Sequence, residues 1–151
     1  MTAREEAKAI LSLVGGDFSR AVQIVQSQLD VLYTRAQVLT TLGGITVTVT
    51  GFSGRLIAST NVLAQNLVIA GLAIVLLSAF YVIQSVMQIR WVTSELSEDK
   101  EATISIILAR RDAKTRALRL GAVILFSGLS LYFLAFALML SHPVPVVVPV
   151  R

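Results

Sequence analysis

Residue types that carry out chemistry are scarce in this sequence. Its single histidine, His142, lies among prolines near the C-terminus and is interpreted as a surface residue. The chain has no cysteine, which excludes a disulfide framework, a thiolate nucleophile and a cysteine metal site. No Ser–His–Asp set, metal-ligand cluster or phosphate-binding glycine loop can be found. The sequence therefore predicts a protein that is not an enzyme, with no catalytic residues, cofactor or metal.

The apolar blocks of the chain also lack the groups that ion-coupled transport requires. No Asp, Glu, Lys, Arg or His lies deep in any of them. Proton relays and carriers keep ionisable residues at mid-membrane in spite of their cost. A pump or secondary transporter is therefore disfavoured.

Composition indicates that lipid is the solvent. The chain is 55% hydrophobic and only 15% charged, with a mean hydropathy of +0.77, whereas about a quarter of a soluble domain is charged. The acidic N-terminus lacks the basic start and adjoining apolar run of a signal peptide, so the first span is expected to direct insertion. The net charge of +4 is better explained by cytoplasmic flanks than by nucleic-acid binding.

We predict an all-α integral membrane protein of a single domain, 1–151, with three transmembrane helices and long cytoplasmic helical extensions. The middle of the first span alternates like a β-strand, but in lipid only a helix satisfies its own backbone. The expected order begins with a short amphipathic helix within 1–16, ended by Gly15 and Gly16, and a cytoplasmic helix at 17–37, capped by Asp17, that continues into span one at 38–57. These are followed by span two at 62–87, a cytoplasmic helix at 92–119, span three at 120–140 and an extended outer tail at 141–151.

The distribution of basic residues predicts the orientation. Of the 13 Lys and Arg, only Arg55, near the outer end of span one, and Arg151, in the tail, lie on the other side of the predicted spans. Because cytoplasmic flanks are enriched in Lys and Arg, we expect the N-terminus in the cytoplasm and the C-terminus outside the inner membrane.

A heptad pattern runs along the predicted helix at 17–37 and points to a helix partner. Apolar residues at alternating spacings of four and three place one stripe against another helix. Packing against the other cytoplasmic helix of the chain and self-association both remain open. The stripe consists of Phe18, Val22, Val25, Leu29, Leu32, Ala36 and Leu39.

Small residues recur every seven positions in each predicted span. Seven residues are two helical turns, so each set lies on one face, and small residues let helices approach closely in lipid. At least two of these faces are expected to pack the spans together, and a surplus face suggests a homo-oligomer. The sets are Gly44, Gly51 and Ala58; Ala64, Gly71, Ser78 and Ser85; and Gly121, Gly128 and Ala135.

Two further groups of polar residues have alternative interpretations. Thr46 and Thr50, which continue the stripe beyond Gly43, either bond to their own helix or line a polar seam of an assembly. The basic face before span three is a candidate site for an anion or for acidic lipid headgroups. It comprises Arg110, Arg111, Lys114 and Arg116.

The layout of the chain resembles a family of membrane effectors. The segments behind this are LDVLYTRAQ at 29–37, before span one, and IILARRDAKTRALRLG at 106–121, entering span three. Over residues 25–140 the chain is similar to the small transmembrane effectors of bacterial anti-phage nucleotide signalling, especially the Pycsar type, and more distantly to the SLATT effectors. This resemblance implies an inner-membrane protein whose cytoplasmic helices sense a nucleotide signal and whose spans then breach the membrane.

Two functions are therefore expected. The first is an oligomeric membrane effector or pore-type protein whose cytoplasmic helices sense a signal. The alternative is a non-conducting scaffold or small accessory subunit of a larger membrane complex that docks a protein partner through the helix at 17–36.

Overall fold

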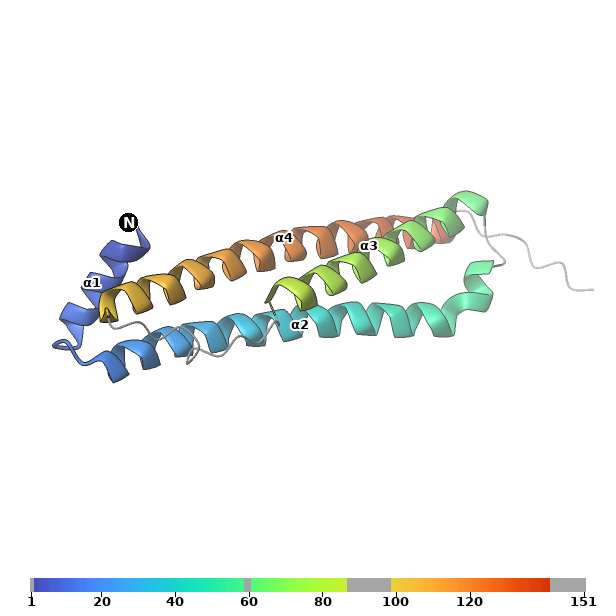
Figure 1. The fold of residues 1–151 in the computed structure, drawn as a ribbon. Coiled ribbons are helices and arrows are strands. Elements are labelled where there is room, and N and C mark those ends of the chain that lie inside the picture. Colours follow the sequence, from blue (N-terminus) through green and yellow to red (C-terminus); the bar gives the residue numbers. More distant parts are fainter. Residues whose placement is uncertain (1, 59–60, 87–98, 142–151) are drawn as a thin grey trace, which may run out of the picture. The chain divides into compact units, whose positions relative to one another are not determined.

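The computed structural model describes residues 2–58, 61–86 and 99–141, except for the side chains of 54–56 and 58, and all regular structure within these ranges is helical. The helices are α1 (Ala3–Leu13), α2 (Phe18–Ala58), α3 (Val62–Val86) and α4 (Lys100–Ser141) (Figure 1). The predicted all-α fold is confirmed. Two units can be distinguished, residues 1–38 with 82–120 and residues 39–81 with 121–151.

Local signals set the helix ends. The Thr2 hydroxyl accepts a hydrogen bond from the Glu5 amide, and the Glu5 carboxylate accepts one from the Thr2 amide, which forms a capping box for α1. Gly15 and Gly16 follow this helix with φ of 64° and 82°, a conformation that glycine adopts without strain. The predicted short helix and its glycine stop are confirmed.

Asp17 caps α2, as predicted. Its carboxylate accepts hydrogen bonds from the amides of Ser19 and Arg20 at 3.0 and 3.3 Å and from the Ser19 hydroxyl at 2.9 Å. The hydrogen bond from the Ser19 hydroxyl has the largest effect, and together these bonds lower the pKa of the Asp17 carboxyl below its ordinary value. From this cap, α2 runs without interruption to Ala58, so the expected continuation of the helix at 17–37 into the apolar block is confirmed.

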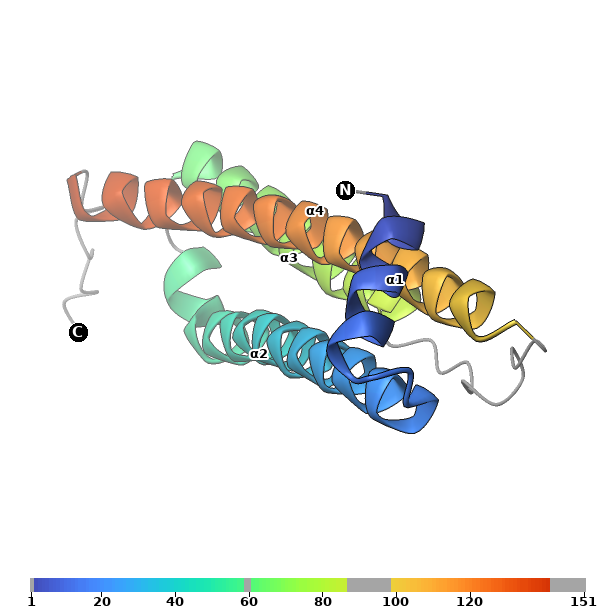
Figure 2. The ribbon, with the colours of Figure 1, turned by 90° about the vertical axis from the view of Figure 1, so that its left-hand side faces the viewer.

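The first unit has a core of small and branched apolar side chains. Ala7 from α1, Ala21 and Val25 from α2, and Ile104 and Leu108 from α4 are all fully buried there. Figure 2 shows α1 lying across α2 and α4 in this unit. The amphipathic α1 is therefore a structural part of this core.

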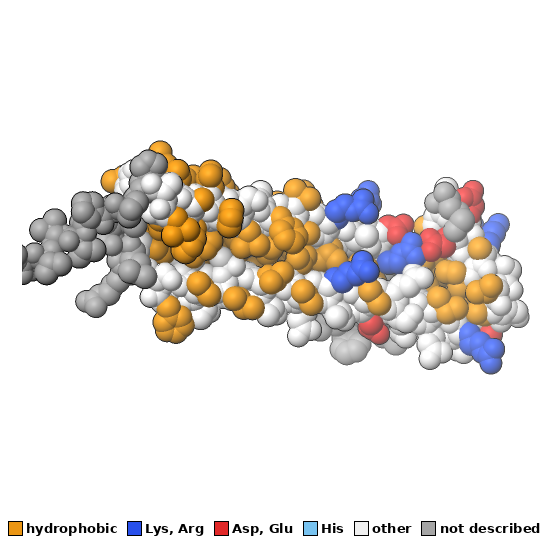
Figure 3. Space-filling view, turned by 180° about the vertical axis from the view of Figure 1, so that it is seen from behind, with side chains coloured by type: hydrophobic (Ala, Val, Ile, Leu, Met, Phe, Trp, Pro, Cys, Tyr) orange, Lys and Arg blue, Asp and Glu red, His pale blue; other side chains and the backbone are white. Residues whose placement is uncertain are grey.

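The second unit contains the apolar halves of the long helices and most of α3. Large hydrophobic side chains cover its surface, as the space-filling view shows (Figure 3). The most exposed are Phe52, Phe133 and Leu140, at 88%, 73% and 71%. In water such a surface would be strongly unfavourable, whereas acyl chains solvate it well.

Two helices of the described chain, α3 and α4, are long and apolar enough to cross a membrane. Only 28% and 17% of their most apolar stretches are buried, unlike the core helices of a soluble protein. Judged by helix length and hydropathy, the predicted count of three spans is wrong. Residues 38–57 are helical, but their many threonines and glycines leave the segment short of the required hydropathy.

The bounds of α4 also differ from the predicted ones. This helix begins at Lys100, because the Asp99 carboxylate accepts a hydrogen bond from the Glu101 amide at 3.0 Å and caps the helix there. Residues 92–98 of the helix predicted at 92–119 lie outside the described residues. From Lys100, α4 continues into the predicted span three as one helix that ends at Ser141. The expected tail and His142 lie outside the described residues.

Candidate functional site

The backbones of α3 and α4 approach each other closely in the second unit. A Cβ placed on Gly71 would lie 2.8 Å from the carbonyl oxygen of Gly128, and one placed on Gly128 would lie 2.9 Å from that of Gly71. Real Cβ atoms do not approach an oxygen so closely, so both positions require glycine. Two turns along, the buried Ser78 hydroxyl donates a 2.6 Å hydrogen bond to the carbonyl oxygen of Gly121. These pairs set an antiparallel register between the helices.

The small-residue sets of α3 and α4 therefore face each other. Besides the two pairs above, Ala64 and Ala135 are buried, at 2% and 0% exposure. This is close packing of small residues, which holds helices together where no hydrophobic effect is available. Two of the three predicted small-residue faces are used within one chain.

The small-residue set of α2 has a different environment. Gly44 and Gly51 are exposed, and no described atom of a neighbouring element lies within 4 Å of a Cβ placed on either. Thr41 and Thr48 are exposed one turn from Gly44 on the same side of the helix. We call Thr41, Gly44, Thr48 and Gly51 the outer face of α2.

The opposite side of α2 packs inward. A Cβ on Gly43 would lie 3.5 Å from Val75 of α3 and 3.9 Å from Leu125 of α4, and Thr50 is only 9% exposed. The Thr46 and Thr50 hydroxyls donate to carbonyl oxygens of their own helix, at 2.9 and 2.7 Å. Of the two interpretations of these threonines, the one in which they bond to their own helix holds.

In the first unit the heptad stripe of α2 packs against its own chain. Val25, Leu32 and Ala36 are buried at 7% exposure or less, and Phe18 and Leu29 are partly buried against the core formed with α1 and α4. Of the two interpretations left open by the sequence, intramolecular packing is the one observed.

The basic face of α4 divides into engaged and unengaged residues. Arg111 donates to both carboxylate oxygens of Glu6 at 2.6 and 2.9 Å, to Gln28 at 2.8 Å and to Asp112 at 2.7 Å. The hydrogen bond with Glu6 is the main cause that raises the pKa of the Arg111 guanidinium, which stays charged. With its side chain only 18% exposed, Arg111 fastens α1 to the other two helices of the unit.

Lys114 is also engaged. Its ammonium donates a 2.6 Å hydrogen bond to the Tyr33 hydroxyl and lies 4.6 Å from the centre of that ring. Arg110 is partly buried and has interactions of its own, so of the predicted set only Arg116 is exposed and without a partner in the described chain. The four residues therefore do not form one open anion site.

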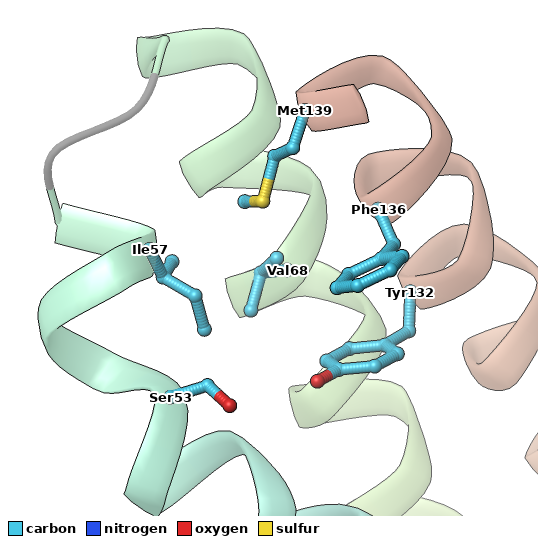
Figure 4. Close-up of a pocket in the computed structure, with 6 residues that line it drawn as sticks. All are labelled: Ser53, Ile57, Val68, Tyr132, Phe136 and Met139. Atoms are coloured by element: carbon cyan, nitrogen blue, oxygen red, sulfur yellow. The ribbon is translucent and has the colours of Figure 1, made fainter. Parts of the chain in front are cut away.

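The second unit contains a small apolar cavity of about 70 Å³ between its three helices. Figure 4 shows the side chains that point into it, from α2, α3 and α4. Small-molecule sites usually measure about 300–1,000 Å³, so this space is too small for a nucleotide. Its lining consists of Ser53, Ile57, Val68, Tyr132, Phe136 and Met139.

Within the described ranges, no group of three His, Asp or Glu side chains is placed to hold a metal ion. Comparison with protein-family models, with curated proteins and with solved structures finds no match for this chain. The surfaces described above are therefore the features from which a function can be inferred. Sequence reasoning did not identify the bond between Arg111 and Glu6, because no local pattern links α1 to a residue about a hundred positions later.

Proposed function

We propose that this chain is an oligomeric membrane effector, anchored by α3 and the apolar part of α4. The exposed hydrophobic surface of the second unit supports a location in the bilayer. Lys and Arg are enriched in the parts of α2 and α4 that belong to the first unit. This enrichment supports a cytoplasmic position for the first unit.

The observation that carries the proposal is the exposed outer face of α2. Because Gly43 packs on α3 and α4, residues 39–58 of α2 accompany these helices into the bilayer. On its own this segment is a poor span, and its outer face offers lipid little apolar surface. A second copy of the same face would cover it, since glycine and threonine allow close helix contact. Self-association through α2 therefore resolves the mismatch between the composition of this segment and its location.

An assembly held together in this way would place α2 helices at its centre. In an assembly of more than two copies their outer faces would converge on the central axis, and the glycines and threonines nearest the axis would form an uncharged, weakly polar lining. The first unit would receive the activating signal, which the resemblance to the Pycsar-type effectors predicts to be a nucleotide. We expect the signal to alter how α1 is held, because the Arg111 cluster joins all three helices of that unit.

A specific observation favours the second candidate, a non-conducting scaffold or accessory subunit. The Thr46 and Thr48 hydroxyls bond to their own helix, so they offer few free polar groups to a channel. In that case the outer face of α2 would contact a helix of a different protein.

Cysteine cross-linking distinguishes these arrangements, because the natural chain has no cysteine. Gly44→Cys and Gly51→Cys should form disulfide-linked dimers when membranes are oxidised. Ile45→Cys is the matched control, because Ile45 is 55% exposed but lies about 100° around the helix from Gly44. Cross-linking at Gly44 and Gly51 but not at Ile45 supports the proposal. Equal cross-linking at all three positions, or none, contradicts it.

Membrane potential then tests the effector role. Induced expression, with a cyclic-pyrimidine nucleotide supplied, should depolarise the cells, and Gly51→Leu should abolish this effect. A potential that stays intact with every nucleotide tried, although the cross-links form, would favour the non-conducting scaffold.

A further inference from the structure

Three arginines of the first unit are exposed and have no hydrogen bond or ion pair with any described residue. They are Arg35 on α2 and Arg116 and Arg119 on α4. Three other exposed basic residues of this unit, Arg4, Lys8 and Arg20, are each paired with a carboxylate, as Arg20 is with Asp17 at 3.6 Å. The exposed Lys100 also has no partner among the described residues, but it lies at the first turn of α4, far along the helix from Arg116 and Arg119. The three arginines thus carry positive charge that the described chain does not compensate.

The contacts between α2 and α4 place these arginines at nearly one level. Arg111 bonds to Gln28 and Lys114 to Tyr33, so the two helices run parallel in this unit with these pairs side by side. Arg35 and Arg116 each follow the second pair by two residues, a rise of about 3 Å. Arg119 lies about 4.5 Å further along α4. Measured along the helix axes, the Cα atoms of the three arginines therefore lie within a layer less than about 8 Å thick.

Their directions differ around the helix pair. Tyr33 and Lys114 point toward each other, and two residues correspond to a turn of about 200° around a helix. Arg35 and Arg116 therefore point away from the contact, on opposite sides of the pair. A compact anion such as a nucleotide would need side chains that converge. Side chains that diverge at one level match a planar layer of negative charge.

The neighbouring residues favour the same ligand. Beyond Asp30 on α2 and beyond Asp112 on α4, neither helix contains another Asp or Glu. Asp112 is held by Arg111 at 2.7 Å. Along the chain the arginines give way to exposed apolar residues, with Val38 at 56% and Leu120 at 50% exposure. Cationic side chains next to an apolar surface are typical of the headgroup region.

We propose that Arg35, Arg116 and Arg119 form a belt that binds the phosphates of anionic phospholipids. This inference depends on the membrane location in the proposed function, but not on self-association. Arginine suits the role, because its guanidinium donates two parallel hydrogen bonds to a phosphate. Each arginine near an anionic surface is expected to strengthen binding about fivefold, and three about a hundredfold.

The test measures lipid binding to the full chain by native mass spectrometry in mild detergent, with phosphatidylglycerol and phosphatidylcholine as probes. The variant Arg35→Gln/Arg116→Gln/Arg119→Gln is compared with Arg4→Gln/Lys8→Gln/Arg20→Gln. The control also removes three positive charges from exposed sites, but each of those residues is paired with a carboxylate. Far-UV circular dichroism checks that both variants keep the helical content of the natural chain.

We expect the natural chain and the control to prefer phosphatidylglycerol, and the belt variant to lose most of that preference. An equal loss in both variants would show that only net charge matters and would overturn the belt. Retention of the preference in the belt variant would also overturn it. Displacement of phosphatidylglycerol by millimolar inorganic phosphate would indicate a compact anion site instead. Failure of the chain to sediment with membranes would reject the proposed function itself.

Discussion

Gly71→Ala should weaken the α3–α4 contact. The new Cβ would lie 2.8 Å from the Gly128 carbonyl oxygen and 3.0 Å from the Tyr132 amide nitrogen. Carbon–oxygen contacts across helices are normally about 3.3 Å or longer, so the backbones must separate locally by about 0.5 Å. Both nearest atoms belong to the backbone, so no side chain can rotate to relieve the clash.

The expected cost combines two opposing effects. Overpacking of a close contact typically costs about 1–3 kcal/mol. The higher helix propensity of alanine returns up to about 1 kcal/mol. The free energy of unfolding should therefore fall by about 1–2 kcal/mol. It is measured by circular dichroism while the fraction of dodecyl sulfate in mixed micelles is increased.

Gly44→Ala is the matched control, because no described atom of a neighbouring element lies within 4 Å of the added Cβ. At a protein concentration low enough to keep the chain monomeric in the micelles, its unfolding free energy should be unchanged or slightly higher, because Gly44 lies on the proposed contact between copies and not on a contact within the chain. The double variant Gly71→Ala/Gly128→Ala should lose less than the sum of its single variants, because one separation of the helices relieves both clashes. If Gly71→Ala were as stable as Gly44→Ala, the helices would not approach at this pair, and the antiparallel register of α3 and α4 would be wrong.

Three further outcomes are expected. Arg111→Ala should lower the free energy of unfolding by about 2 kcal/mol, because it leaves the half-buried Glu6 carboxylate of α1 unpaired, and hydrogen exchange in α1 should accelerate. Arg4→Ala is the control, and it should cost less than about 1 kcal/mol because it loses only an exposed ion pair. Folding lowers the pKa of the Asp17 carboxyl, so the stabilisation that the charged carboxylate gives the protein is present at neutral pH and is lost as the pH falls below about 4. Asp17→Asn keeps a capping side chain that does not titrate, so it should remove this pH dependence from a circular dichroism titration. Ser78→Ala should cost about 0.5–1.5 kcal/mol in the mixed-micelle assay by removing a buried bond to the Gly121 carbonyl, and an unchanged stability would contradict that bond.

Local signals in the sequence predicted most helix boundaries correctly. Asp17 as a cap, the Gly15–Gly16 stop and the continuous helix through residue 38 follow from short-range chemistry, and the structure has each of them. The seven-residue spacing of small residues also predicted which faces of α3 and α4 pack together. These features depend only on neighbours within a few turns.

The remaining features depend on contacts distant in the sequence. Whether the basic face of α4 can bind an anion depends on Glu6 and Tyr33. These residues bind Arg111 and Lys114, from which they are separated by 105 and 81 positions in the sequence. Periodicity could not show that Gly43 faces inward while Gly44 faces outward, since adjacent residues in a helix differ by about 100° and the direction of the core was unknown. Residues 38–57 do not meet the hydropathy expected of a span for a compositional reason, because threonine and glycine satisfy helix geometry while contributing little hydropathy.

We claim above all that copies of the chain associate through the outer face of α2, and the mass of the purified protein in mild detergent shows whether they do. Native mass spectrometry should give a single closed assembly of several copies for the natural chain and a monomer for Gly44→Leu/Gly51→Leu. No described atom of a neighbouring element lies within 4 Å of a Cβ at either position, so the monomer itself should stay folded with leucine there. A natural chain that is monomeric, or a variant that assembles as the natural chain does, would contradict the claim.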